Sequence, residues 1–185
     1  MPLYPGDTPA AVRVLQSIAR GDSLTSSELT IGCHIGTHAD APAHFLAGGA
    51  TLDRLPLECF TGPAVVIALD ALDAAAIPPR RHILIRSSNS ALLRHSFRYD
   101  YVTPSIGAIA ALLSRDPLSI GFDYYSLDPA DSTTYPCHMT VARAGIPAFV
   151  CLALGGVDPG DYWFTALPLP VADLEGCPVR AILAR

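Results

Sequence analysis

The 185-residue sequence predicts a mixed α/β domain with more strand than helix. Six short apolar runs rich in β-branched residues are spread along the chain, whereas only one segment has clear helical periodicity. Half of the residues are hydrophobic, and 17 prolines and 14 glycines interrupt the pattern, which indicates a compact chain built from many short elements. The length predicts a single domain over residues 1–185.

The first segment, PAAVRVLQSIARG (9–21), fits either a helix or a strand. Beyond it, apolar runs bounded by turn residues predict strands at 28–33, 64–69, 82–86, 118–123, 147–154 and 162–169. A helix is predicted over 103–115, with Thr103 as its N-cap, Pro104 at the first helical position and apolar residues at helical spacing. We expect a second, shorter helix after His138.

Charge and composition exclude several classes of protein. The net charge of −5 combines acidic and basic residues without a basic run, which argues against a nucleic-acid partner. No apolar stretch approaches the ~18 residues of a membrane span, and the opening MPLYPGDTPA does not resemble a signal peptide. The five cysteines are odd in number and form no CxxC, so we expect a cytoplasmic protein with free thiols.

The segment HIGTHADAPAHF (34–45) concentrates titratable side chains. Three of the six histidines and one aspartate lie within these twelve residues. His34, His38, Asp40 and His44 all occupy even positions, so an extended strand would place them on one face. The other histidines upstream of residue 100 stand alone and are expected to be structural: His82 and His95.

Spacing decides whether these groups could share a metal ion. Two residues along a strand span about 6.6 Å, which suits His38 and Asp40, but four residues span about 13 Å, too far for His34 and His38. We therefore expect a sharp bend at Gly36, because glycine accepts positive φ. Imidazoles and a carboxylate suit Zn²⁺, Mn²⁺ or Fe²⁺, and three protein ligands leave one position open. The alternative is a hydrogen-bonded polar cluster without a metal.

HIGTHADAPAHF resembles the HxGTHxDxPxHF signature of the bacterial kynurenine formamidase and metal-dependent cyclase family. The similarity extends to segments 4–14, 118–140, 155–170 and 177–185, which is nearly the whole chain. The resemblance implies an α/β fold, a swivelling β/β/α domain with a mixed, barrel-like sheet and few helices. It also implies assembly into a homodimer or a homotetramer.

The resemblance further implies roles for individual residues. His44 becomes the histidine that transfers protons, His138 becomes a ligand of a second metal, and the ligands of the first metal become His34, His38 and Asp40. The family completes its second site with a glutamate twelve residues beyond the last histidine, where this chain has Val150. Because valine cannot ligate, we expect one divalent ion per chain, zinc or manganese.

A second departure concerns the loop that precedes His138. The formamidases have Thr-Pro where this chain has Tyr124 and Tyr125, so these tyrosines, with Ser126, are candidates for substrate binding. The alternative is that both tyrosines only pack. Asp123 and Asp128 in the same loop could contact substrate or form turns.

Three functions are compatible with these observations. The first is metal-dependent hydrolysis of a small-molecule amide, cyclic amide or ester, such as an aryl-formamide or an isatin-like lactam, with His44 as acid and base. The second is a metal-dependent cyclase or dehydratase in the biosynthesis of aromatic polyketides or other natural products. The third is a non-catalytic binding protein.

Overall fold

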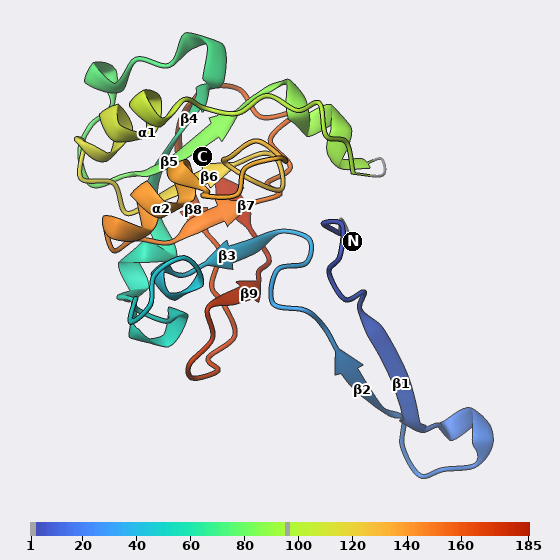
Figure 1. Cartoon of the computed structure of the whole chain (residues 1–185). Helices are drawn as coiled ribbons and strands as arrows, with labels where there is room; N and C mark the ends of the chain where they lie inside the picture. The colour runs from blue at the N-terminus through green and yellow to red at the C-terminus, as the bar shows by residue number, and fades with distance from the viewer. Residues whose placement is uncertain (1–2, 95–96) are drawn as a thin grey trace.

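The computed structural model describes residues 3–94 and 97–185 and contains a central mixed sheet of eight strands (Figure 1). These strands are β3 (His38–Asp40), β4 (Thr61–Ala68), β5 (His82–Arg86), β6 (Ser119–Phe122), β7 (Ala148–Val150), β8 (Gly160–Thr165), β9 (Gly176–Pro178) and β10 (Ile182–Ala184). A separate hairpin is formed by β1 (Ala11–Gln16) and β2 (Ser26–Thr30).

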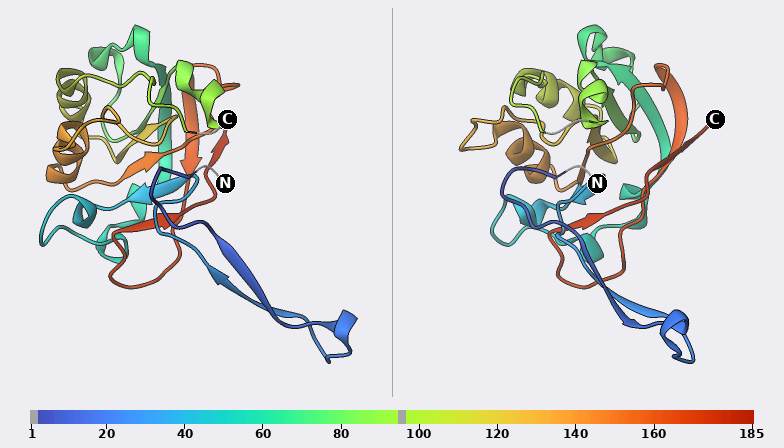
Figure 2. Two further views of the ribbon diagram at one scale, coloured as in Figure 1. Left: turned by 45° about the vertical axis from the view of Figure 1, so that its right-hand side comes forward. Right: turned by 90° about the vertical axis from the view of Figure 1, so that its right-hand side faces the viewer.

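The order of strands in the large sheet is β10-β8-β4-β5-β6-β7-β3-β9. Strands β4 to β7 pair in parallel, and the outer pairs are antiparallel. The sheet curls on itself (Figure 2). Its two edge strands are β9 and β10, which follow one another along the chain. This confirms the predicted mixed, barrel-like sheet.

Two α-helices, α1 (Ile106–Leu113) and α2 (Pro136–Arg143), pack beside one another on one face of the sheet (Figures 1 and 2). The alternation of strand side chains forms two cores: Ile83 and Ile85 pack with the helices, whereas Leu84 faces the inside of the curl. The other helical segments are short 3₁₀ turns at Ile18–Arg20, Pro42–His44, Leu52–Arg54, Leu57–Cys59, Leu69–Ala71, Ala74–Ala76 and Ser88–Arg94. No helix in the described ranges is both long and apolar enough to cross a membrane.

The helices begin at different residues from those predicted. Helix α1 is capped by Ser105, whose Oγ accepts a hydrogen bond from the Ala108 amide at 3.1 Å, and so it starts after Thr103 and Pro104. Helix α2 starts at Pro136 and therefore contains His138, which we expected to precede it.

Each predicted run contains a strand, but three of the strands end early: β2 ends at Thr30 rather than residue 33, β8 ends at Thr165 rather than residue 169, and β7 is the shortest relative to its prediction. Strand β5 matches its prediction residue for residue, and the ambiguous N-terminal segment contributes strand β1. The run 147–154 is a strand only over β7, because Cys151 takes a left-handed φ of 55° and ends the ladder.

The β1–β2 hairpin projects from the body of the molecule as an arm (Figures 1 and 2). Every residue of β1 is exposed. The arm nevertheless carries large apolar side chains that are open to solvent, namely Val12, Val14, Leu15, Ile18, Leu24 and Leu29. Several large apolar side chains exposed on one projecting element are typical of a protein interface.

Candidate metal centre

The segment that carries the clustered histidines bends where the sequence predicts. Gly36 has a φ of +64°, and strand β3 begins only at His38. The bend brings the rings of His34 and His38 to a centroid separation of 5.2 Å. One ligand atom from each of His34, His38 and Asp40 lies within 4.8 Å of the others, so the predicted convergence is confirmed.

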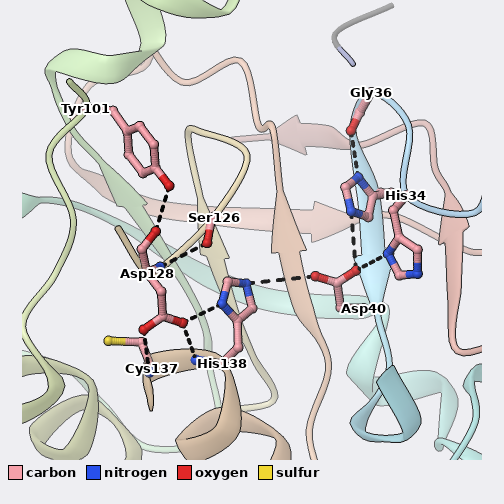
Figure 3. A network of polar contacts seen from close by, with 9 residues as sticks. His34, Gly36, Asp40, Tyr101, Ser126, Asp128, Cys137 and His138 are labelled. Atoms are coloured by element: carbon pink, nitrogen blue, oxygen red, sulfur yellow. Dashed lines mark hydrogen bonds and ion pairs between the residues drawn. The ribbon is translucent and has the colours of Figure 1, made fainter. Parts of the chain in front are cut away.

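Hydrogen bonds orient both imidazoles toward Asp40 (Figure 3). Nδ1 of His38 donates to the carbonyl oxygen of Gly36 at 2.8 Å, which leaves its Nε2 facing Asp40 Oδ1 at 3.2 Å. Nδ1 of His34 lies 2.7 Å from the same carboxylate oxygen. Three side-chain atoms of the kinds that ligate zinc and manganese therefore lie close enough together to hold one ion.

Electrostatics keep the central carboxylate ionised. Burial opposes this, but the charge of His38 and the hydrogen bonds from both imidazoles hold the pKa of Asp40 well below its usual value. For His34, burial alone would lower the pKa, but hydrogen bonds to Asp40 and Glu175 outweigh it and raise the pKa. The cluster thus carries the anionic oxygen that a cation site requires.

His44 reaches the cluster by a different route from the one expected. The chain leaves the strand after Asp40, and the 3₁₀ turn Pro42–His44 follows, so the single extended face predicted for all four residues is wrong for His44. Its ring stacks on His34 with centroids 3.9 Å apart and an angle of 23°. His44 therefore faces the same cavity as the proposed ligands.

His138 approaches Asp40 from the first turn of α2. The buried carboxylate of Asp128 accepts hydrogen bonds from the amides of Cys137 and His138 at 2.7 and 3.0 Å, and contacts His138 Nδ1 at 2.7 Å. Asp128 thus caps the helix and orients the imidazole, whose Nε2 points toward Asp40 Oδ2 at 3.9 Å (Figure 3). The turn-forming interpretation of Asp128 missed this link.

Val150 lies directly beside the centre. It is fully buried and pairs with His38 across β7 and β3, so the two side chains share a face of the sheet. A carboxylate at this position would share that face with His38 and Asp40, whereas valine offers no ligand atom.

A cavity of about 730 Å³ opens above these residues. Tyr125 and Ser126, two of the three candidates for substrate binding, line it. Tyr124 does not: it is fully buried in the helix-covered core, where its hydroxyl exchanges hydrogen bonds with the backbone of Arg98, so the expectation for Tyr124 is corrected. Sequence reasoning did not single out three further aromatic side chains that line the cavity, namely Tyr4, Phe45 and Tyr135.

One isolated histidine, His82, lies outside the cavity of the metal centre. His82 is buried, and its Nδ1 lies 2.7 Å from Ser119 Oγ, but within the described part of the chain its Nε2 has no hydrogen-bond partner. It is structural, as expected, but only half satisfied. His95 lies outside the described residues.

The sequence of the chain is similar to those of a known protein family. Residues 1–129 match the family model described as "Putative cyclase". The kynurenine formamidase of Bordetella avium (strain 197N) is 37% identical over 191 residues, which cover 98% of this chain and 91% of that protein. The kynurenine formamidase of Bordetella petrii is also 37% identical, over 198 residues and the same shares of the two chains.

A solved structure with a matching fold points the same way. A protein described as a potential metal-dependent hydrolase with cyclase activity superposes with a TM-score of 0.82 and 26% identity, over 99% of this chain and 90% of that one. Isatin hydrolase A from Ralstonia solanacearum has a TM-score of 0.80 over 100% of this chain and 86% of its own, but at 24% identity it supports the fold alone.

Proposed function

The chain belongs to the putative cyclase family, and on that premise we propose that it is a metal-dependent hydrolase of a small-molecule amide, cyclic amide or cyclic ester. The observation that carries the proposal is the convergence of His34, His38 and Asp40 within 4.8 Å beside a cavity of about 730 Å³. That volume is typical of sites for small organic ligands. An aryl-formamide or an isatin-like lactam fits the aromatic lining.

Each proposed ligand has a defined orientation. His34, His38 and Asp40 would hold one divalent ion, zinc or manganese, with His38 Nε2 free because its Nδ1 donates to Gly36. A bound divalent ion polarises a carbonyl group and lowers the pKa of water. The protein would contribute the anionic carboxylate of Asp40 and the fixed orientations of the His34 and His38 rings. The walls of the cavity would restrict the approach of substrate.

Proton transfer is assigned to His44. Its ring lies against His34 and faces the cavity, so it can exchange protons with a substrate held there. His138 would contribute through Nε2, because Asp128 occupies its Nδ1. With Val150 in place of a carboxylate, we assign His138 to hydrogen bonding with substrate and expect one metal ion per chain.

Aromatic side chains and one hydroxyl would position the substrate. Phe45 stacks on His138 with ring centroids 4.7 Å apart, and Tyr4 meets Tyr125 edge to face at 6.3 Å. Flat aromatic groups pack well against such walls. Ser126 adds a hydroxyl at the same cavity.

Metal analysis and turnover test the proposal together. Purified chain should contain about one equivalent of zinc or manganese and hydrolyse an aryl-formamide or isatin. His38→Ala should lose both the metal and the turnover. His44→Ala is the matched variant: it keeps all three ligands, so it should bind metal but turn over slowly. A chain that binds no added zinc or manganese, or a His38→Ala variant that stays active, would contradict the proposal.

A second candidate is a metal-dependent cyclase or dehydratase. The family description and the cyclase activity named for the solved structure favour it, and the same metal and His44 could polarise a carbonyl and remove a proton. The mass of the product separates the two reactions, since hydrolysis adds one water to the substrate and dehydrative closure removes one. Ligand binding without turnover at full metal loading would indicate a binding protein.

We also propose that the chain forms a homodimer or a homotetramer in the cytoplasm. The exposed apolar side chains of the β1–β2 arm support assembly, because a second copy would remove them from water. The five free cysteines support a reducing compartment.

A further inference from the structure

Glu175 lies next to the metal centre although it is 141 residues from His34 in the sequence. It immediately precedes β9, the edge strand that pairs with β3, and its carbonyl oxygen accepts a hydrogen bond from the Ala41 amide at 2.8 Å. Its side-chain Oε1 lies 3.3 Å from His34 Nε2. The backbone pairing of the edge strand β9 with β3 therefore places the Glu175 carboxylate beside the ring of a proposed ligand.

Gly176 gives the ring of His34 its place. A Cβ atom at residue 176 would lie 2.7 Å from Nε2 and 2.9 Å from Nδ1 of His34, closer than real Cβ contacts. The imidazole thus lies against the bare backbone of β9, with one edge facing Asp40 and the other facing Glu175. Only glycine leaves room for this arrangement.

The two nitrogens of His34 then have different tasks. Nδ1 lies 2.7 Å from Asp40 inside the cluster, and Nε2 is directed to Glu175 outside it. We propose that Glu175 is a positioning residue, which accepts the Nε2 proton of His34 in a hydrogen bond and thereby turns the Nδ1 lone pair toward the metal. This inference rests on the proposed metal centre at His34, His38 and Asp40.

Two neighbouring histidines, His38 and His138, support the assignment, because in each of them the ring nitrogen that faces away from Asp40 is held by an oxygen atom. Nδ1 of His38 donates to the Gly36 carbonyl, and Nδ1 of His138 contacts the Asp128 carboxylate. Outer acceptors of this kind fix the tautomer of a ligating histidine, and their loss typically weakens metal binding about 10- to 100-fold. Since 42% of the Glu175 side chain is exposed, we expect an effect near the lower end, about 10-fold.

The test measures zinc affinity of the full chain by competition with a chromophoric chelator. Glu175→Ala should weaken zinc binding about 10-fold, and Glu175→Gln, which keeps a neutral acceptor oxygen, should lose less. Glu58→Ala is the matched control, because Glu58 is exposed on a 3₁₀ turn away from the cavity. Nitrogen chemical shifts of His34 in the zinc-bound chain should show Nε2–H in the wild type and a mixed tautomer in Glu175→Ala.

The outcomes are distinct. Weaker zinc binding and a changed His34 tautomer in Glu175→Ala, with a melting temperature equal to that of Glu58→Ala, would support the positioning role. Zinc affinity within two-fold of the wild type, with His34 still in the Nε2–H form, would overturn it while leaving the proposed function intact. A wild-type chain that binds no zinc would overturn both.

Discussion

Replacing Val150 by glutamate should create a second metal site. Val150 is fully buried, faces the same side of the sheet as His38, and lies where the family resemblance places a ligand carboxylate. His138 Nε2 lies 3.9 Å from Oδ2 of Asp40, which shares a face of β3 with His38. The substitution would therefore supply the second carboxylate that His138 and Asp40 need in order to hold another ion.

Without metal, the variant should be much less stable. Loss of a fully buried valine side chain costs about 1.5 kcal/mol, and a buried carboxylate near Asp40 costs several kcal/mol more. A total of about 5 kcal/mol lowers the melting temperature by about 10–20 °C for a chain of this length. A second ion at 100 times its dissociation constant should restore about 2.7 kcal/mol.

Metal content and thermal melting with and without zinc measure both effects. The wild type should hold one ion per chain and Val150→Glu two, whereas Val150→Gln, which has a similar shape but no charge, should hold one. A Val150→Glu chain with a single ion, whose melting temperature zinc raises no more than that of Val150→Gln, would refute the reasoning. A wild-type chain with two ions would refute it as well.

Three further outcomes are expected. Burial lowers the pKa of His82 to about 4. On acidification the unfolded chain therefore protonates this imidazole at a higher pH than the folded chain does, and the free energy of unfolding falls as the pH drops from 6.5 toward 4. The unfolding free energy of the wild type relative to His82→Leu, from urea denaturation, should therefore decrease by about 2 kcal/mol between pH 7 and pH 5, and a flat difference would contradict the assignment. Asp128→Asn should lower the unfolding free energy by about 1–3 kcal/mol in the same assay, because two amides and an imidazole lose a charged acceptor; an unchanged value would argue against its capping role. Val12 and Leu29 pair across the arm, so replacing both by glutamate should yield monomers in light scattering, and an oligomer that persists would locate the interface elsewhere.

Local sequence determined much of the fold and the position of the centre. Strand β5 follows directly from its apolar run, and the spacing of His34, His38 and Asp40 around Gly36 requires the bend that the structure contains. These features depend on residues close together in the chain, where backbone preferences and side-chain period carry the information.

Tertiary structure decided which distant groups complete the centre. Glu175 reaches His34 only because β9 pairs with β3, and Asp128 reaches His138 by capping α2 across a loop. The two adjacent tyrosines are a further case, because their sequence context does not distinguish them. Only the packing of the sheet and the helices buries the ring of Tyr124 in the core and leaves Tyr125 to line the cavity. Strand pairing and the direction of a loop side chain depend on long-range packing, and no local pattern encodes them.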